Sequence, residues 1–283
     1  MRFLFFFIIT LSIYAKGNYF WQMNESQINN KIISLSESKN TYTQKVKTLT
    51  ELFMKTPYIL NVLGEGKKKP LYSFKGVDCV TYIESVLAIS NSKNLKDSIN
   101  FLQKIRYKNG EIRYNKRNHF MMSQWIPNNK KLGLIEELTD KVSKNIKIME
   151  KSITKSNFDK KFKAFKILNE DLPIGEYKIK YIPINKFIKY QNKLKIKDGT
   201  IMVVIRENRK DYPIFTSHLG FIINGKKSKI FRSAVTNSYY KEVRDYNLGS
   251  YLRFYSKYYS KTSWKIVGVS LYSPKDLNES GNK

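Results

Sequence analysis

The spacing of apolar residues changes once along this chain, and the change limits the folds that the sequence can adopt. From Asn24 to about Met54 apolar residues recur every three or four positions, which is typical of helices with one buried face. After Pro173 short apolar runs are separated by turn signals, which predicts strands. Helices in the first half and antiparallel strands in the second half favour the α+β class.

Further helices and strands are predicted at defined places. An extended loop is expected over 55–77, where glycine and proline are frequent, and the basic segment near 136–169 is expected to be helical or mixed. The Asn224-Gly225 pair predicts a hairpin turn. The predicted helices are Cys79 to about Ser90 and Leu95 to Arg106, and the predicted strands are Ile179–Ile184, Thr200–Ile205, His218–Ile223, Lys229–Ala234 and Trp264–Leu271.

Residues 1–15 have the character of a secretory signal peptide. Arg2 is followed by about a dozen mostly apolar residues and then by the small residue Ala15. This run is shorter than the roughly 20 residues of a transmembrane helix, and an uncleaved membrane anchor is the alternative. We therefore expect residues 16–283 to form one domain with a helical N-terminal extension and insertions. It would be exported, periplasmic or secreted, and would meet a membrane only through the signal segment before cleavage.

The chain is strongly basic, with 52 Lys and Arg against 23 Asp and Glu and a formal net charge of +29. Such an excess can indicate nucleic-acid binding, because cationic side chains release counterions from phosphates. Here the charge is spread along the whole chain, and its densest cluster, from Lys141 to Lys166, is accompanied by no recognition motif. A solvated basic surface is the preferred interpretation, and no specific nucleic-acid partner is expected.

The chain contains one cysteine and two histidines. This count excludes an internal disulfide, an iron–sulfur centre and a cysteine-based zinc site, so no metal and no cofactor is expected. In an oxidising compartment an unpaired thiol is a liability unless it is buried or used. The single cysteine is therefore the first candidate for chemistry, and an ordinary buried cysteine is the alternative.

Cys79 is predicted to lie in the first turn of a helix. The preceding Asp78 can cap that helix, because its carboxylate can accept hydrogen bonds from the free amides of the first turn. At this end the helix dipole favours the thiolate, which is the nucleophilic form of cysteine. The same amides can bind an oxyanion that forms when the thiolate attacks a carbonyl.

A cysteine hydrolase also needs a base, and the two histidines are the candidates. His218 lies on a predicted strand 139 residues after Cys79, a separation typical of papain-like proteases. His119 lies in a loop flanked by aromatic residues, which suits contact with a ligand better. We expect His218 to be the base and a polar residue of the following strand, Arg232 or Ser233, to orient its ring.

Several segments occur in an order and spacing that match a known pattern. Val77–Glu84 is similar to a nucleophile motif F-D-C-V-T-F-V-E, and Thr56–Tyr58 to a T-P-Y element. The other matching segments are Tyr107–Gly110, Arg117–Phe120 through Trp125-Ile126, Tyr181–Pro183, Asp198-Gly199, Ser217–Gly220 and Tyr251-Leu252. In these segments the chain resembles the exported cysteine amidases of the DUF1460 group, which are N-acetylmuramoyl-L-alanine amidase-like proteins of the NlpC/P60 class.

This resemblance implies a papain-like fold in which N-terminal helices pack on an antiparallel sheet. It implies hydrolysis of the amide between the muramic acid lactyl group and L-alanine in peptidoglycan fragments (muropeptides). Carried over by motif position, Cys79 is the nucleophile, His218 the base, and Tyr58 the residue that directs its hydroxyl at the oxyanion. Cleavage within the stem peptide by an endopeptidase of the same fold is an alternative.

The remaining motif positions imply further roles. Asp78, Glu84, His119 and Trp125 fall where the family shapes or lines its cleft. Ser233 stands where the family commonly has histidine in an R-H-A-S segment, and a serine holds the catalytic imidazole less firmly. A catalytically impaired protein that binds cell wall or a polyanion through its basic face is therefore a further alternative.

Overall fold

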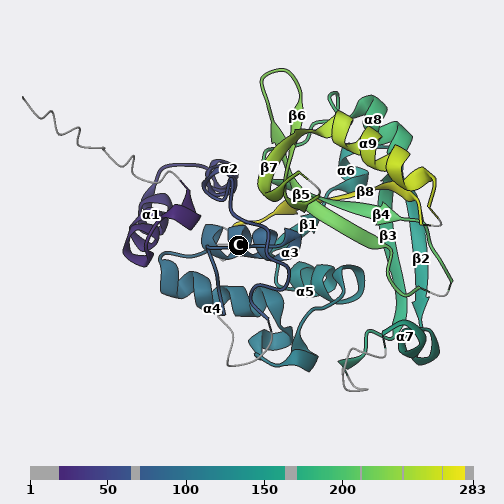
Figure 1. Cartoon of the computed structure of the whole chain (residues 1–283), viewed down its shortest axis with the longest axis horizontal. Helices are drawn as coiled ribbons and strands as arrows, with labels where there is room; N and C mark the ends of the chain where they lie inside the picture. Colours follow the sequence, from purple (N-terminus) through teal and green to yellow (C-terminus); the bar gives the residue numbers. More distant parts are fainter. Residues whose placement is uncertain are drawn as a thin grey trace, which may run out of the picture.

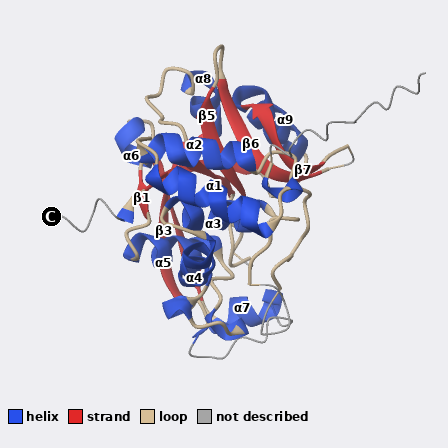
Figure 2. Cartoon of the chain, turned by 90° about the vertical axis from the view of Figure 1, so that its left-hand side faces the viewer, coloured by secondary structure: helices blue, strands red, loops and turns tan. Residues whose placement is uncertain are grey.

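A computed structural model describes residues 19–64, 71–162, 171–210, 212–237, 239–262 and 264–277. The first helices form a layer beside one face of a β-sheet, and two later helices cover the opposite face (Figure 1). The turned view in Figure 2 shows α1 to α4 stacked in front of the strands. The predicted signal peptide at residues 1–15 lies outside the described residues.

The N-terminal helical region consists of two helices rather than one. α1 (Glu25–Glu37) begins after Asn24 and α2 (Tyr42–Leu52) after Thr41, and each capping side chain accepts a hydrogen bond from the third amide of its helix. These caps satisfy amides that have no partner within the helix. The predicted helical region is thus confirmed, with a break between residues 37 and 42.

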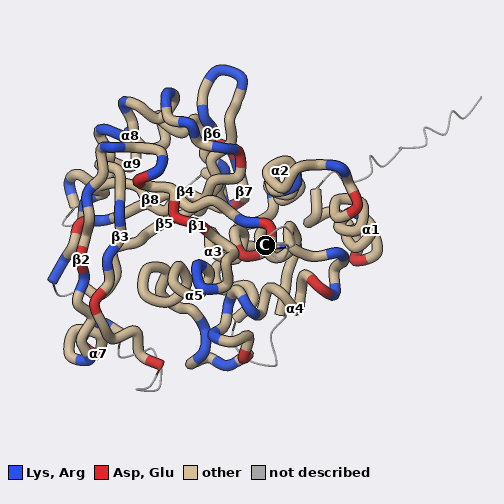
Figure 3. Tube along the Cα trace, turned by 180° about the vertical axis from the view of Figure 1, so that it is seen from behind, with Lys and Arg blue, Asp and Glu red and all other residues tan. Residues whose placement is uncertain are grey.

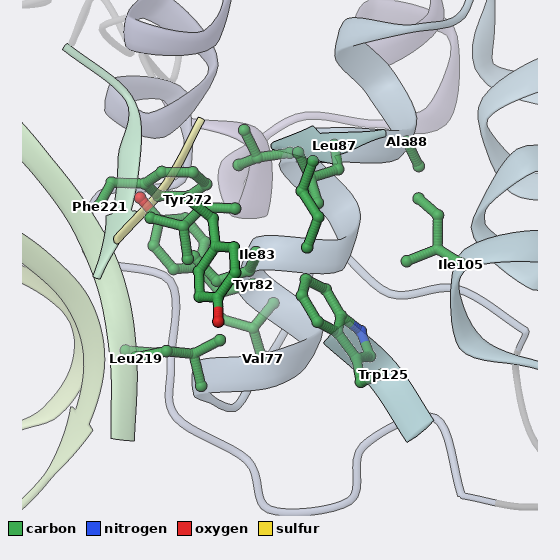
Figure 4. Packing of buried hydrophobic residues seen from close by; sticks show 14 of the residues in the cluster. Val77, Tyr82, Ile83, Leu87, Ala88, Ile105, Trp125, Leu219, Phe221 and Tyr272 are labelled. Carbon is green, nitrogen blue, oxygen red and sulfur yellow. The ribbon is translucent and has the colours of Figure 1, made fainter. Parts of the chain in front are cut away.

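The next two helices have the predicted bounds. α3 (Cys79–Ser90) is buried along almost its whole length, as expected for a helix that is apolar on nearly every side. Tyr82 of α3 meets Phe221 of the sheet edge-on, with ring centroids 5.4 Å apart, and Figure 4 shows Leu219 on the same side of the helix. α4 (Leu95–Arg106) packs on α3 and carries a basic last turn.

The other helices are short, apart from α9. They are η1 (Phe20–Gln22), η2 (Lys108–Gly110), η3 (Tyr114–Lys116), the π-turn η4 (Met121–Trp125), α5 (Ile126–Lys131), α6 (Thr139–Val142), α7 (Lys155–Phe162), α8 (Ile184–Tyr190) and α9 (Leu248–Ser260). Of these, α8 and α9 are unpredicted helices that pack against the sheet.

Within the described residues the strands form one eight-stranded antiparallel sheet in the order β2-β3-β8-β4-β5-β6-β7, with β1 paired to β8. The strands are β1 (Ile135–Glu137), β2 (Lys147–Ile153), β3 (Gly175–Pro183), β4 (Thr200–Arg206), β5 (Thr216–Asn224), β6 (Lys229–Thr236), β7 (Lys241–Asn247) and β8 (Ile266–Pro274). All five predicted strands are present, and the α+β class with an antiparallel sheet is confirmed. The basic segment proves to be mixed, since it contains both strands and helices.

The hairpin predicted at Asn224-Gly225 joins β5 to β6. Asn224 pairs with Lys229, so the connection is the four-residue loop 225–228, closed by a hydrogen bond from the Gly225 amide to the Ser228 carbonyl. Side chains alternate between the two faces of β5. Leu219 and Phe221 pack with α3, whereas Ile222 packs with α8 and α9.

Basic residues are spread over most elements, as Figure 3 shows. Inside the basic cluster Lys151 is buried, and its ammonium donates to the Asn208 side chain and the Arg209 carbonyl. Lys163 and Lys166 lie outside the described residues. None of the helices in the described part of the chain is long and apolar enough to cross a membrane.

Candidate active site

Cys79 occupies the first position of α3, and Asp78 caps the helix as predicted. One carboxylate oxygen of Asp78 accepts hydrogen bonds from the amides of Val80, at 3.0 Å, and Thr81, at 2.8 Å. The other accepts from the amide of Asn61, at 3.3 Å. Asp78 therefore fixes the start of α3 and the loop in front of it. Cys79 as a whole residue is half-buried, with its sulfur on the buried side, where burial raises the pKa of the thiol.

The ladder between β5 and β6 opens beside Cys79. Pairing of the two strands runs only from Asn224 to Phe221, which faces Arg232, and it does not continue toward the start of β5. Leu219 lies in the opened part, and its backbone amide lies near enough to the sulfur of Cys79 to lower the pKa of the thiol. The gap therefore brings the nucleophile candidate to the backbone next to His218.

Ser233 lies across this gap and joins its two sides. Its hydroxyl lies 2.6 Å from the Leu219 carbonyl and 3.0 Å from Nε2 of His218. A carbonyl can only accept, so the single hydroxyl hydrogen goes to Leu219 and the hydroxyl oxygen accepts from His218. Nε2 of His218 then carries the hydrogen, and Nδ1 is the nitrogen with a free lone pair.

His218 is held in its uncharged form. Burial lowers the pKa of its imidazole to about 4, and the positive charge of Arg206 contributes in the same direction. Its ring lies between aromatic neighbours, with centroid distances of 5.8 Å to Phe231 and 6.3 Å to Tyr251. A neutral imidazole with a free Nδ1 is a base at neutral pH.

Burial and a neighbouring charge also favour the uncharged thiol of Cys79, against the effect expected from the helix dipole. Burial raises its pKa to about 12 and the negative charge of Asp78 adds to the rise, while backbone hydrogen bonds from Leu219, Cys79 and Val80 oppose it. Desolvation and a like charge thus outweigh the favourable helix terminus. Within the described residues no hydrogen bond joins the thiol to His218. The resting pair is therefore a thiol and an imidazole rather than a thiolate and an imidazolium.

Tyr58 lies near Cys79, in the loop before α3. Its backbone pairs with Val77, so the two segments on either side of the loop are held together. Burial raises the pKa of its phenol to about 12, and the charges of Cys79 and Asp78 add to the rise. A phenol keeps its hydrogen at neutral pH even at its ordinary pKa, so this hydroxyl can donate it to an oxygen near the sulfur.

Of the two candidates for orienting His218, the structure brings only Ser233 to the ring. Arg232 instead forms a two-point ion pair with Asp245, with contacts of 2.6 and 2.9 Å, and donates to Thr50. Since neighbouring residues of a strand point to opposite faces, Arg232 turns toward the α2 side.

His119 and Trp125 are held by residues outside the pair. Nε2 of His119 is 2.8 Å from the Tyr114 carbonyl, and no interaction in the described part of the chain joins His119 to Cys79 or His218. Trp125 is only 1% exposed, and its indole donates to Glu84 at 3.0 Å, beside the Glu84–Arg106 ion pair. Direct contact of Trp125 with a substrate does not fit this burial, and Trp125 instead supports α3 from behind.

Three residues beside the pair were not predicted as site residues, although Tyr251 lies in the matched Tyr251-Leu252 segment. Arg206, Tyr251 and Tyr255 surround His218, and the Tyr255 ring lies nearly parallel to the imidazole with centroids 6.5 Å apart. The two tyrosines had a detectable signal, because Leu248, Tyr251 and Tyr255 follow a helical spacing after the capping residue Asn247. Arg206 had no such signal. A charged residue at the end of an apolar strand usually marks the point where the chain reaches solvent, so the sequence gives no reason to place Arg206 in a site.

Comparison with known proteins assigns the chain to a family. Residues 48–256 match the family model described as AmiA-like, N-acetylmuramoyl-L-alanine amidase-like. The chain belongs to this family. A search of curated proteins finds no match. The family is one of amidase-like cell-wall hydrolases. Membership of this family suggests that the protein is an enzyme.

Solved structures share the fold over nearly their whole length. A Legionella pneumophila protein of the DUF1460 family is similar with a TM-score of 0.72 and 25% identity, over 90% of this chain and 99% of that one. An N-acetylmuramoyl-L-alanine amidase from Bacteroides uniformis has a TM-score of 0.65 and 20% identity, over 84% and 100%. A putative xylanase from Bacteroides fragilis has a TM-score of 0.62 and 22% identity, over 80% and 99%.

Proposed function

We propose that this protein is an exported cysteine amidase that hydrolyses the lactyl–L-alanine amide of muropeptides, on a papain-like fold of the NlpC/P60 class. The observation that carries the proposal is the position of Ser233, which leaves Nδ1 of His218 unprotonated next to Leu219, whose amide lies near the sulfur of Cys79. Membership of an amidase-like family supports the reaction class. The substrate class follows from the family description and is part of the proposal.

The proposed reaction starts from the uncharged pair. As the sulfur of Cys79 bonds to the lactyl carbonyl carbon, its proton passes to Nδ1 of His218. The imidazolium then gives this proton to the alanine nitrogen, the carbon–nitrogen bond breaks, and the peptide leaves with a free amine. Water next attacks the thioester with His218 as base, which releases the lactyl carboxylic acid and restores the thiol.

Two donors suit the oxygen that becomes negative during these steps. The Cys79 amide lies at the start of α3, where the helix dipole favours a negative charge. The Tyr58 hydroxyl keeps its hydrogen at neutral pH as any phenol does, and burial raises its pKa further above that range. Together they form the proposed oxyanion site, with Asp78 fixing the loop and helix that carry them.

Product analysis with defined muropeptides tests this function. Wild-type protein should release a free L-alanyl peptide, and the Cys79→Ala variant should release none. Among the histidines, His218→Gln should abolish turnover, whereas the matched His119→Gln control should keep most of it. Mass spectrometry also separates the endopeptidase alternative, which would leave L-alanine attached to the lactyl group and cut within the stem. Unchanged release by Cys79→Ala would refute the proposal.

A second candidate is a catalytically impaired protein that binds cell-wall fragments or polyanions. The observation that favours it is the raised pKa of Cys79 together with a neutral orienting residue, Ser233. In that case wild type and Cys79→Ala would bind muropeptides equally and neither would release peptide. Binding that falls steeply with salt for any polyanion would assign the affinity to the basic surface alone.

Export is the remaining part of the proposal, supported by the character of residues 1–15. Expression of the full chain in a bacterial host, followed by fractionation and intact-mass measurement, tests it. A mature protein that starts after Ala15 in the periplasm or medium is the expected result. Full-length protein in the cytoplasm would contradict it, and full-length protein in the membrane would indicate an uncleaved anchor.

A further inference from the structure

An aromatic hollow of about 240 Å³ lies beside the proposed catalytic pair, between the end of β6 and the first turns of α9. It is lined by Val235, Asn237, Tyr246, Asn247, Ser250, Tyr251, Phe254 and Tyr255. Two of these rings, Tyr251 and Tyr255, also face His218, with centroids 6.3 and 6.5 Å from the imidazole. Burial mainly raises the pKa of both phenols, and the charge of a Cys79 thiolate adds to the rise, so both rings lie within electrostatic reach of the sulfur.

The lining of the aromatic hollow points to an uncharged ligand. None of the eight described residues that line it is charged, although the chain has 52 Lys and Arg. Tyr251 and Tyr255 are stacked with centroids 4.4 Å apart, and Phe254 forms a rim that is 66% exposed. Within the lining itself an ionic group would lose its hydration without gaining a charged partner, and Arg253 reaches only Ser250 from outside the lining. Flat aromatic faces instead suit a ligand that is apolar on its faces and polar at its edge.

Hydroxyl groups in the lining of the aromatic hollow can form hydrogen bonds with the polar edge of such a ligand. Tyr246 accepts a hydrogen bond from Asn237 at 3.4 Å, and Ser250 accepts one from Arg253 at 3.3 Å. Each of these hydroxyls still has a hydrogen to donate. A pyranose ring has the complementary form, because its C–H face packs on an aromatic ring while its hydroxyls accept and donate around the edge.

We propose that the aromatic hollow binds the sugar ring on the acyl side of the scissile amide, which rests on the proposed function. In that reaction the lactyl group becomes bonded to Cys79, so the sugar that carries it must lie within one short linkage of the sulfur. The aromatic hollow is the described cavity that reaches the pair through Tyr251 and Tyr255. Its volume is below the roughly 300–1,000 Å³ of sites for drug-sized molecules, which fits one ring rather than a glycan chain.

A pair of substrates and a pair of variants test this inference. The substrates are a muramyl peptide and the same lactyl peptide without the sugar. Phe254→Ala should raise KM for the muramyl peptide roughly tenfold, the loss of one aromatic contact, with little change in kcat. It should leave KM for the sugar-free peptide unchanged, and Phe254→Trp should restore the wild-type value. Tyr258→Ala is the matched control, because Tyr258 is 63% exposed one turn further along α9 and does not line the aromatic hollow.

The possible outcomes separate this inference from the proposed function. If wild type cleaves both substrates and Phe254→Ala changes KM equally for both, or for neither, the sugar site is wrong while the amidase stands. If wild type cleaves neither substrate, the proposed amidase function is wrong. The sugar site can then still be tested by titrating the protein with N-acetylmuramic acid, because wild type should bind this sugar and Phe254→Ala should not. If Phe254→Ala changes only the sedimentation behaviour, the aromatic hollow is a self-association surface and the inference is overturned.

Discussion

Alkylation of Cys79 gives a direct test of the uncharged resting pair. Iodoacetamide reacts with the thiolate form of cysteine, and Cys79 is the single cysteine of the chain, so mass added to wild type in excess of that added to Cys79→Ala reports on this residue. Burial and the charge of Asp78 raise the pKa of the thiol from 9.0 to about 12. Since one pH unit changes the thiolate fraction tenfold, the folded protein should hold about a thousandfold less thiolate than an ordinary thiol at neutral pH.

The assay follows the rate of alkylation by intact mass between neutral and strongly alkaline pH. The rate should rise about tenfold per pH unit up to at least pH 10, about one unit beyond the point where an ordinary thiol reaches its plateau. The same protein in urea provides the ordinary rate. Asp78→Asn should react faster than wild type in the folded state, because it removes the nearby charge and asparagine is an equally good helix cap.

A plateau below pH 7, at a rate near that of the unfolded protein, would refute this reasoning. It would mean that thiolate and imidazolium are already formed in the resting enzyme. Restricted access of the reagent to the sulfur would also slow alkylation. The ultraviolet absorbance of the thiolate separates the two effects, because it reports the charge of the sulfur without a reagent. That absorbance, measured against Cys79→Ala, should appear only at strongly alkaline pH.

Three further changes should have measurable effects. Glu84→Gln should lower the free energy of unfolding, measured in urea, by about 3–5 kcal/mol, because it leaves the buried charge of Arg106 without its partner. A loss below about 1 kcal/mol would contradict the importance of this ion pair. Gly220→Ala should cost about 1–3 kcal/mol, since its Cβ would lie 2.6 Å from the Phe231 ring and 2.7 Å from the Arg232 carbonyl oxygen. An unchanged melting temperature would show that both the ring and the β6 backbone give way. The pKa of His218 is about 4 in the folded protein and near 6.5 when unfolded, so its contribution to stability is complete above pH 6.5 and is lost as the pH falls toward 4. Between pH 8 and pH 5 wild type should therefore lose about 2 kcal/mol of unfolding free energy relative to His218→Gln, and equal losses in the two proteins would contradict the buried neutral ring.

Features that depend on neighbouring residues could be predicted from the sequence. The start of α3 follows from the capping carboxylate of Asp78, and the strand that carries His218 follows from its apolar run. β7 was missed because Val243 is its one buried apolar residue among charged and polar neighbours, which hides the alternation of a strand. Membership of the amidase-like family was also predicted, from short ordered motifs.

Features that depend on distant segments could not be predicted from the residues alone. The contact of Ser233 with His218 exists because the β5–β6 ladder opens after Phe221, and no local pattern shows where a ladder ends. The uncharged state of Cys79 arises from burial against the sheet, which outweighs the helix terminus that the sequence reveals. In both cases tertiary packing decides the outcome.

The part played by Leu219 has a consequence for mutational scanning of this protein. Its side chain packs in the core, while its amide lies near the sulfur of Cys79 and lowers the pKa of the thiol, and its carbonyl accepts from Ser233. Replacement by another apolar residue keeps both backbone groups, so a scan would classify Leu219 as a tolerant packing position. Only a change of the main chain, such as proline or an amide-to-ester replacement, would remove the amide hydrogen. A site built partly from backbone is thus invisible to methods that exchange side chains alone.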